Sequence, residues 1–336
     1  MRKRNQFLQR IAVVLVVGLL SACSSSSGTS SAVEQASLGK TQQKENASYE
    51  KVTINNLGHT LTFTQPPKRA VALNQHATEI MLALGLQDSM VGTAYLDDAI
   101  LPEFKDTYAK IPVLSKAYPS KEVFMATAPD FAYAGWKSAF TEKALGTVQE
   151  LASAGIPAYI QESSTTPFPT LENVYQDIRN IGRIFDVEER AETLIATMQK
   201  DIDRTVKQVG SVTKPLNVFV YDSGEDKALT AAGNYMSSLI ALAGGKNIFS
   251  DIEKGWAEVS WEEVVHHNPD VIVIIDYGAK TVEEKKNVLL SKKELAEAPA
   301  IVNQRFIVLP LSAAAEGIRA PQTLDILARG LHPKAF

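Results

Sequence analysis

Large aromatic side chains stand near the ends of the strands that the pattern of this chain predicts. Tyr95 ends the second predicted strand, Trp136 follows the third, Tyr221 is near the end of a later one, and Trp256 lies in a loop. In open α/β sheets, ligands collect at the carboxyl ends of the strands. An aromatic ring there can bury roughly 150–250 Å² against a flat or apolar molecule. These four residues therefore favour recognition by stacking rather than bond breaking.

The same rings could instead belong to the hydrophobic core. Tyr133 lies inside an alternating strand, where a core position is expected. Trp136 and Trp256 lie in loops beside Gly135 and Gly255, and such positions favour an exposed ring. We therefore expect the two tryptophans to line a binding site and Tyr133 to pack inside.

Two polar residues are candidates for contacts with a bound molecule. Arg319 lies between the last predicted strand and the last predicted helix, and its planar guanidinium suits carboxylates or phosphates. It could equally be a surface residue paired with Glu316. His76 follows the first strand, where it could contact the ligand or form a hydrogen bond within its own loop.

Motifs of the common enzyme and metal-site classes do not occur in the sequence. There is no G-x-S-x-G, GxxxxGK[ST] or HExxH motif and no pair of thiols, so neither catalysis nor a cofactor is expected. A bare metal-ion site would need about three histidines and a carboxylate. We assign no metal ligand, because the histidines form no such group along the chain: His59, His76, His266, His267 and His332.

Strand and helix patterns alternate along most of the chain from residue 51. This order is typical of an α/β fold in which mostly parallel sheets are flanked by helices. The predicted strands are 69–74, 90–95, 130–135, 157–161, 216–222, 270–276 and 305–311. The predicted helices that alternate with them are 77–84, 120–128, 141–154, 234–243, 260–267 and 321–330.

Two consecutive helical segments interrupt this alternation. Residues 171–184 and 187–209 are helical with no strand between them, and the second segment carries a continuous apolar stripe. At 1.5 Å per residue, about 23 residues make a rod of roughly 35 Å. We expect residues 185–210 to be one long rigid helix, a spacer outside either core, joining an N-terminal lobe (51–184) to a C-terminal lobe (211–336).

A short internal repeat supports the presence of two similar lobes. A Glu-x6-Pro-Asp pattern begins at Glu122 and returns at Glu262. In each half this pattern joins a predicted helix to the strand that follows it. The chain is therefore expected to contain two copies of a helix–Pro-Asp–strand unit.

The N-terminus has the pattern of a secretory signal and a lipid anchor. A basic start, an apolar run and small residues before Cys23 predict a signal peptide over residues 1–22. Cys23 is the only cysteine and stands where the lipobox of bacterial lipoproteins requires one, so lipid attachment there is expected. Residues 23–50 are rich in Ser, Gln and Glu and have no apolar periodicity, which predicts a flexible tether.

The charge balance argues against one class of partner. Cleavage before Cys23 removes four basic residues and leaves 30 basic against 38 acidic residues, a net charge of −8. Nucleic-acid-binding proteins usually carry a basic surface. We therefore expect no nucleic-acid partner.

Several short motifs together resemble the periplasmic binding proteins of iron–siderophore and vitamin B12 importers. Each motif is degenerate, but their order and spacing over about residues 50–336 are specific. They lie at 67–73, 78–85, 91–92, 243–247, 256–260, 268–270 and 331–333, with Glu122, Pro129, Asp130 and Glu262. The resemblance implies two α/β lobes joined by one long helix, with the ligand in the cleft between them.

The resemblance also implies a function. The chain would be an extracytoplasmic, lipid-anchored monomer that binds a metal-chelate small molecule and delivers it to the permease subunits of an ABC importer. An iron(III)–siderophore complex is the first expectation, a corrinoid (vitamin B12) or haem is the alternative, and a bare metal ion is less well suited. The tryptophans favour a corrinoid, but residues 313–315 are alanines where the B12-binding relatives have an acidic residue.

Site residues follow from the same resemblance. Tyr95, Trp136, Tyr221 and Trp256 fall close to the ligand-stacking aromatics of the B12-binding relatives, and the family often has a ligand-contacting arginine near Arg319. Family members dock on the transporter through one exposed carboxylate per lobe. Matching outward from the two tryptophans gives Glu142 and Glu262 as docking residues, whereas the internal repeat pairs Glu262 with Glu122.

Overall fold

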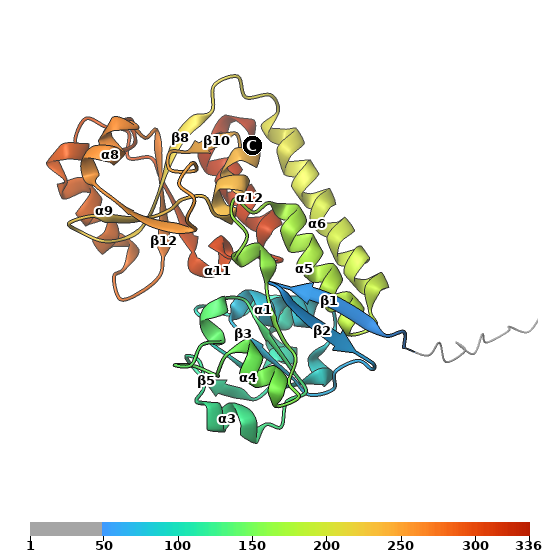
Figure 1. Ribbon diagram of the computed structural model, residues 1–336. Coiled ribbons are helices and arrows are strands. Elements are labelled where there is room, and N and C mark those ends of the chain that lie inside the picture. Colours follow the sequence, from blue (N-terminus) through green and yellow to red (C-terminus); the bar gives the residue numbers. More distant parts are fainter. Residues whose placement is uncertain (1–48) are drawn as a thin grey trace, which may run out of the picture. The chain divides into compact units, whose positions relative to one another are not determined.

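The computed structural model describes residues 49–336. The expected signal peptide, Cys23 and all but the last two residues of the expected tether lie outside this range. Within it the chain forms two large β-sheets, each with helices packed against it, as the α/β pattern predicts, and a separate two-stranded sheet (Figure 1). No helix of the described residues has the length and apolar character needed to cross a membrane.

The first sheet lies in the N-terminal lobe and is parallel throughout. Its five strands follow the order β5-β4-β3-β6-β7. Buried apolar residues lie on both of its faces, because side chains alternate along each strand. The strands are β3 (Ala70–Leu73), β4 (Met90–Ala94), β5 (Val113–Ser115), β6 (Phe131–Ala134) and β7 (Ala158–Ile160). The helices are α1 (Gln75–Ala83), α2 (Lys105–Tyr108), α3 (Lys121–Ala126) and α4 (Val148–Ser153).

The second sheet lies in the C-terminal lobe and is mixed: three of its five strand pairings are parallel, as expected, and two are antiparallel. Its order is β11-β9-β8-β12-β13, with β10 also paired to β8. The strands are β8 (Leu216–Ser223), β9 (Ala228–Ala231), β10 (Gly245–Asn247), β11 (Trp256–Val259), β12 (Val271–Asp276) and β13 (Phe306–Pro310). As predicted from its β-branched residues, β12 is buried on both faces over residues 271–275.

The antiparallel part of this sheet has a local cause. Strand β9 returns beside β8 after only residues 224–227, and a parallel crossover needs about a dozen residues or more. Gly224 makes the turn possible, since its φ is +95° and a Cβ there would lie 2.0 Å from the Lys227 carbonyl oxygen. The helices of this lobe are α7 (Tyr235–Leu242), α8 (Trp261–His266), α9 (Val282–Ser291), α10 (Pro299–Val302), α11 (Leu311–Ala314) and α12 (Ala320–Leu331).

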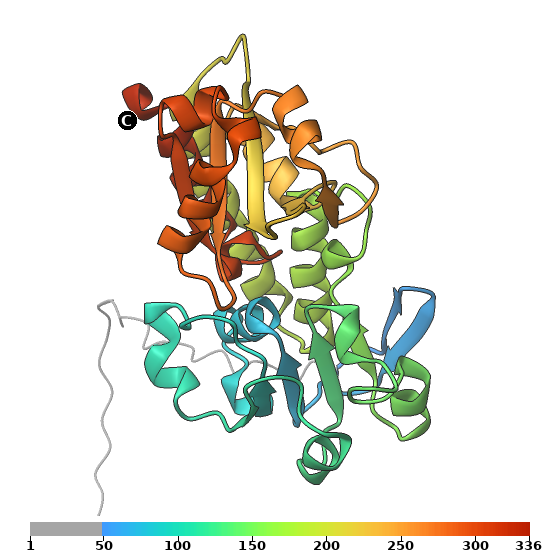
Figure 2. The same ribbon diagram turned by 90° about the vertical axis from the view of Figure 1, so that its left-hand side faces the viewer.

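Helices α5 (Leu171–Ile184) and α6 (Glu188–Val209) join the two lobes, whereas the sequence analysis assigned this role to residues 185–210 alone. Figure 2 shows both helices running from one lobe to the other. The expectation that the long helix is a spacer outside either core is wrong. Its apolar stripe packs on α5 and α12, and Ala191, Ile195, Met198 and Ile202 are buried in a core cluster that contains residues of both sheets.

The expected helix over residues 141–154 is also wrong, because only its second half is helical. Gly146 has a φ of +96°, which ends the preceding turn. Thr147 then caps α4, accepting a hydrogen bond from the Glu150 N–H while the Glu150 carboxylate accepts one from the Thr147 N–H. This capping box starts a new helix. The N-terminal hairpin of β1 (Val52–Asn56) and β2 (His59–Phe63) was not predicted either.

The internal repeat corresponds to two equivalent structural units. Serine caps begin α3 and α8, so that Glu122 and Glu262 are each the second residue of their helix. After each helix an aspartate accepts hydrogen bonds from backbone N–H groups at the edge of the neighbouring strand. Asp130 accepts them at Lys68 and Arg69, before β3, and Asp270 accepts one at Asn217 in β8.

Candidate functional site

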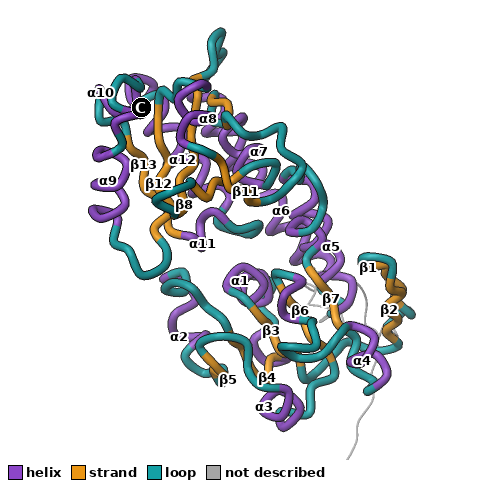
Figure 3. The backbone as a smooth tube through the Cα atoms, turned by 60° about the vertical axis from the view of Figure 1, so that its left-hand side comes forward, coloured by secondary structure: helices purple, strands orange, loops and turns teal. Residues whose placement is uncertain are grey.

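A cavity of about 550 Å³ opens between residues of the two lobes. Trp136, Ser163 and Pro167 line it on one side, and Asn234, Lys254 and Trp256 line it on the other. A second cavity of about 240 Å³ adjoins it, and the two share Trp136, Asn234, Trp256 and Glu316. The combined volume lies in the range of small-molecule sites, roughly 300–1,000 Å³. The two lobes that contribute these residues are shown in the tube view (Figure 3).

Trp136 follows β6 and is held by an aromatic cluster. Its ring centroid lies 5.1 Å from that of His76 and 6.3 Å from that of Tyr95. Tyr95 in turn lies 4.5 Å from Tyr118. The Trp136 backbone N–H donates to the Asn74 side-chain oxygen at 3.2 Å. The structure therefore brings Tyr95, His76 and Trp136 together, and Trp136 lies in the cavity wall whereas Tyr95 lines neither cavity.

The buried His76 ring packs against Trp136. It lies in α1, is 2% exposed, and burial lowers its pKa to about 4, so the ring is neutral at pH 7. Gly135 allows the close approach, because a Cβ there would lie 2.0 Å from His76 Nε2. His76 does not line either cavity. Its contact with a ligand would be indirect, through Trp136.

Trp256 does not lie in a loop as expected but begins β11, an edge strand of the second sheet, and it is 36% exposed. Gly255 before it is also exposed, as the loop position predicts. Tyr277 lines the second cavity with 41% exposure, and the buried Lys285 ammonium holds its backbone carbonyl at 2.8 Å. The C-terminal lobe therefore contributes two partly exposed rings to the cleft.

Tyr221 does not face the cleft. It is fully buried in β8, packs against Phe219 and Trp261, and donates a hydrogen bond from its hydroxyl to the Gly224 carbonyl at 2.8 Å. Successive strand residues point to opposite faces of a sheet. The next residue, Asp222, is the one that lines the second cavity. Tyr133 is likewise buried, as predicted, and donates to Gln161.

Arg319 lies at the junction of the lobes rather than in the wall of either cavity. Its Nε donates to Glu79 Oε2 at 2.8 Å, a second guanidinium nitrogen reaches Glu79 Oε1, and the same nitrogen donates to the Ala99 carbonyl. Glu79 is 1% exposed and Arg319 is 9% exposed. The guanidinium that the sequence assigns to the ligand is thus paired within the protein, and its partner is not Glu316.

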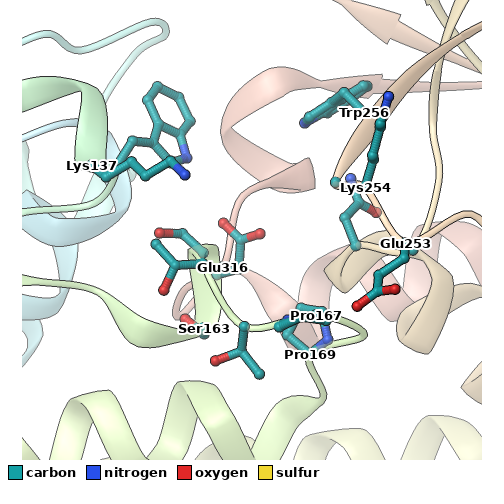
Figure 4. Close-up of a pocket in the computed structure, with 15 residues that line it drawn as sticks. Lys137, Ser163, Pro167, Pro169, Glu253, Lys254, Trp256 and Glu316 are labelled. Carbon is teal, nitrogen blue, oxygen red and sulfur yellow. The ribbon is translucent and has the colours of Figure 1, made fainter. Parts of the chain in front are cut away.

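Glu316 is the functional candidate that the sequence reasoning treated only as a neighbour of Arg319. It is 8% exposed and lines both cavities. Burial, opposed by a backbone hydrogen bond and reinforced by the negative charge of Asp177, raises its pKa to about 7. Figure 4 shows its carboxylate pointing into the cavity, with Lys137 on one side and Trp256 on the other. The sequence feature that could have identified Glu316 is its position after the last predicted strand.

Charged and hydroxyl residues complete the lining. Residues 163–166, a Ser-Ser-Thr-Thr run after β7, line the larger cavity. Lys137 and Lys254 are exposed at its rim, and Glu253 is exposed beside Lys254. Among residues 49–336, no arginine lines either cavity. Within residues 49–336 no group of three or more His, Cys, Asp or Glu side chains is arranged to hold a metal ion.

The candidate docking residues all lie on the surface. Glu142 is exposed in the turn before Gly146, and Glu262 is exposed at the start of α8. Glu122 is exposed at the equivalent position of α3. Glu122 is therefore the structural equivalent of Glu262 in the N-terminal lobe. Cys23, the candidate site of lipid attachment, lies outside the described residues.

Sequence comparison finds relatives with transport roles. The profile of a family described as periplasmic binding protein matches residues 71–313. A Bacillus subtilis (strain 168) protein described as the uncharacterized ABC transporter substrate-binding lipoprotein YvrC is 26% identical over 291 residues, 85% of this chain and 87% of its own length. The vitamin B12-binding protein of Pectobacterium atrosepticum is 26% identical over 212 residues, 62% of this chain and 71% of its own.

Structural comparison agrees. A periplasmic binding protein from Veillonella parvula has a TM-score of 0.78 and 32% identity, covering 84% of this chain and 98% of its own. The periplasmic heme-binding protein RhuT from Roseiflexus has a TM-score of 0.65 and 26% identity, covering 80% of this chain and 100% of its own. Both matches extend over most of the two lobes described above.

Proposed function

The chain belongs to the periplasmic binding protein family, whose members serve ABC importers, and on this premise we propose that its cargo is a corrinoid of the vitamin B12 class. The relatives are substrate-binding transport proteins and not enzymes. The cleft between the lobes holds the corrinoid outside the cytoplasm, and the loaded protein then delivers it to the permease subunits.

One observation carries this assignment: two tryptophans from opposite lobes line the cavities, whereas no arginine of the described residues does. Trp136 and Trp256 offer π-faces and apolar edges to a large, semi-rigid complex. The lining residues include two cations, Lys137 and Lys254, against three acids, Asp222, Glu253 and Glu316. Such a lining suits a neutral or positively charged complex.

The same charge argument weighs against two other cargo classes. A ferric catecholate complex is strongly anionic, and haem carries two carboxylates, for which arginine provides the best-matched donors. Arg319, the cation that could have served, is held by Glu79. The 26% identity to RhuT, a haem-binding protein, is matched by the 26% identity to vitamin B12-binding proteins. Sequence similarity is therefore neutral, and the charge of the lining favours the corrinoid.

An iron(III)–siderophore complex of the hydroxamate type is the second candidate. Such complexes are neutral or carry a positive charge, so the acidic lining of the cleft would accept them as well. They offer less flat conjugated surface than a corrin ring, so less of the two tryptophan rings would be covered by stacking. The order of the two candidates therefore depends on stacking.

Membrane attachment is proposed to occur through a lipid on Cys23. The supporting observation is that the only cysteine of the chain follows a basic and apolar N-terminus. The tether over residues 23–50 would let a monomeric body reach the permease. Cys23→Ala should abolish lipid labelling and release the protein from membranes without unfolding it. Unchanged membrane association of the variant would show that the anchor lies elsewhere.

Docking on the permease is proposed to use Glu262 and one carboxylate of the N-terminal lobe. The structural equivalence of α3 and α8 favours Glu122 for this second role, with Glu142 as the alternative. An exposed carboxylate on each lobe would pair with a cation on each membrane subunit.

A ligand screen by thermal shift and native mass spectrometry tests the proposed cargo. Cobinamide, cyanocobalamin, ferrioxamine B, ferric enterobactin and haemin would each be added to the purified mature protein. A ligand present at 100 times its Kd stabilises the folded state by about 2.7 kcal/mol. We expect stabilisation by the two corrinoids and weaker stabilisation by ferrioxamine B. Stabilisation by ferric enterobactin or haemin alone would overturn the charge argument and the assignment.

A further inference from the structure

Glu316 is a buried acid that forms no ion pair with any cation of residues 49–336. It is 8% exposed, and none of the ion pairs formed within residues 49–336 includes it. The cation three residues away, Arg319, is engaged by Glu79. Burying a charged carboxylate without a cation beside it is costly in free energy. A carboxylate in this position, aimed into a ligand cleft, is therefore better explained by a partner on the ligand than by the fold.

The hydroxyl groups that line the larger cavity with Glu316 also act as hydrogen-bond acceptors. Ser164 donates its hydroxyl hydrogen to the Gln161 carbonyl at 2.8 Å, and Thr165 and Thr166 donate theirs to the Glu162 carbonyl at 3.0 and 2.9 Å. A hydroxyl has one donor and two acceptor lone pairs. With the hydrogens donated to the backbone, these three lining residues offer the cavity only acceptors.

Asn234 supplies the complementary group. Its side-chain oxygen accepts from the Met236 N–H at 3.1 Å, which leaves the amide N–H₂ as its free part. Asn234 is 8% exposed, and it lines both cavities together with Glu316 and the two tryptophans. The shared wall thus combines two stacking rings, one buried anionic acceptor and one amide donor. The two lysines of the lining, Lys137 and Lys254, are exposed.

We propose that Glu316 is a specificity-determining residue that accepts a hydrogen bond from an amide N–H or an ammonium group at the edge of the ligand, and that Asn234 donates to the oxygen of such an amide. This inference rests on the proposed cleft function and deepens it. A ligand edged with primary amides satisfies both residues. A ligand with carboxylates at the same positions places like charges against Glu316.

Two corrinoids that differ in their edge groups test this directly. Cobinamide carries amides at its periphery, and cobyrinic acid carries carboxylates in their place. Affinities would be measured by isothermal titration at pH 8 with the full mature protein. The variants are Glu316→Leu, which removes the acceptor, and Glu316→Gln, which keeps a neutral acceptor. Glu258→Leu, at an exposed carboxylate of β11 that lines neither cavity, is the matched control.

We expect wild type to bind cobinamide at least about 100-fold more tightly than cobyrinic acid. Glu316→Leu should weaken cobinamide binding by about 10-fold or more, since hydrogen bonds to charged groups are the stronger ones. Glu316→Gln should lie between the two, and Glu258→Leu should match wild type. The preference for cobinamide over cobyrinic acid should shrink in both Glu316 variants, because the repulsion of carboxylates is removed.

The outcomes separate this inference from the cargo assignment. Cobinamide binding that is unchanged in Glu316→Leu, by a variant that folds normally, overturns the role of Glu316 and leaves the cargo assignment intact. If wild type binds ferrioxamine B, which carries an ammonium group, but neither corrinoid, the cargo assignment is wrong. The role of Glu316 would then stand only if Glu316→Leu weakens ferrioxamine B binding. Failure to bind any of the three overturns both.

Discussion

Trp136 and Trp256 line the same cleft with different degrees of support. The Trp136 ring rests against His76 and Tyr95, whereas Trp256 lies on an edge strand with 36% exposure. Trp261, the third tryptophan, is 4% exposed and packs against Phe219 in the C-terminal core. At the scale of single residues, exposure and packing together therefore distinguish rings available to a ligand from rings that hold the fold.

Removing either cleft tryptophan should weaken ligand binding. We expect Trp136→Ala and Trp256→Ala each to lower the binding free energy by about 1–3 kcal/mol, the range for loss of a buried aromatic anchor. Trp256→Ala should hardly change stability, since its ring is partly exposed. Titration calorimetry and thermal unfolding measure the two effects. Trp261→Ala is the contrasting variant, and it should mainly lower the stability of the fold. Unaltered affinity in both Trp136→Ala and Trp256→Ala would exclude these two residues from the site.

The raised pKa of Glu316 links stability to pH. Burial raises this pKa from the ordinary 4.5 to about 7, so the folded protein binds a proton that the unfolded chain has lost between those two values. Stability from this group is therefore present below pH 4.5 and lost as pH rises towards 7. Replacement by Gln, which carries no charge, removes that loss.

Glu316→Gln should accordingly be more stable than wild type at pH 8 and equal to it near pH 4.5. At 1.36 kcal/mol per pKa unit, the difference at pH 8 is on the order of 3 kcal/mol. Urea unfolding of both proteins across this range measures it. The lowered pKa of His76 acts in the opposite direction but is common to both proteins, so it cancels in the comparison. A difference that does not vary with pH would contradict the assignment of this titration to Glu316.

At the scale of elements, the start of α12 is tied to α1 by a buried ion pair. Arg319 immediately precedes α12, and its guanidinium reaches Glu79 in α1 and the Ala99 carbonyl. Gln75 and the Leu101 N–H also contact the Glu79 carboxylate, so the acid is well satisfied. This pair joins an N-terminal-lobe helix to a C-terminal-lobe helix and thereby helps to fix the walls of the cleft.

Breaking this pair on one side should be strongly destabilising. Arg319→Ala leaves the Glu79 carboxylate buried without its cation, which typically costs about 3–5 kcal/mol. Arg329→Ala, which removes an exposed ion pair to Asp325 in the same helix, should cost no more than about 1 kcal/mol. Chemical denaturation compares the two. The double variant Arg319→Met with Glu79→Gln should recover most of the loss, and equal effects of both single variants would argue against a special role for the buried pair.

At the scale of the whole molecule, the repeated unit places equivalent acids on both lobes. Glu122 and Glu262 each follow a serine cap by two residues, and each unit ends in an aspartate bound to the first strand of its sheet. A transporter with two similar membrane subunits would meet two similar surfaces. This equivalence is why Glu122 is preferred to Glu142 as the partner of Glu262.

Charge reversal at the equivalent pair should block delivery without affecting capture. The double variant Glu122→Arg with Glu262→Arg should bind ligand normally, because neither residue lines a cavity, but should fail in uptake. Like charges across an interface cost several kcal/mol and suppress association. Uptake by cells or by permease vesicles, together with calorimetry, measures both steps. If Glu142→Arg with Glu262→Arg blocks uptake instead, the spacing from the tryptophans was the better guide.

The sequence by itself determined the class of the fold and much of its secondary structure. Periodicity and caps placed α5 at 171–184 and most other predicted elements within two residues, because those signals are local. Local signals also marked the two tryptophans that line the cavities, namely the glycine before each and, for Trp136, its position after β6. The helix expected over 141–154 was misjudged, because the capping box at Thr147 was not recognised.

Only the tertiary structure decided which polar groups meet. Arg319 and Glu79 are 240 residues apart in the chain, and no local pattern indicates that they form a pair. Tyr221 and Asp222 are adjacent, yet the orientation of β8 in its sheet sends the ring to the core and the acid to the cleft. Only the structure identifies Glu316 as a site residue, because it shows that the nearby cation, Arg319, pairs with Glu79 and not with Glu316. Hydrophobic periodicity is a property of each segment, whereas charge pairing and burial depend on how the segments assemble.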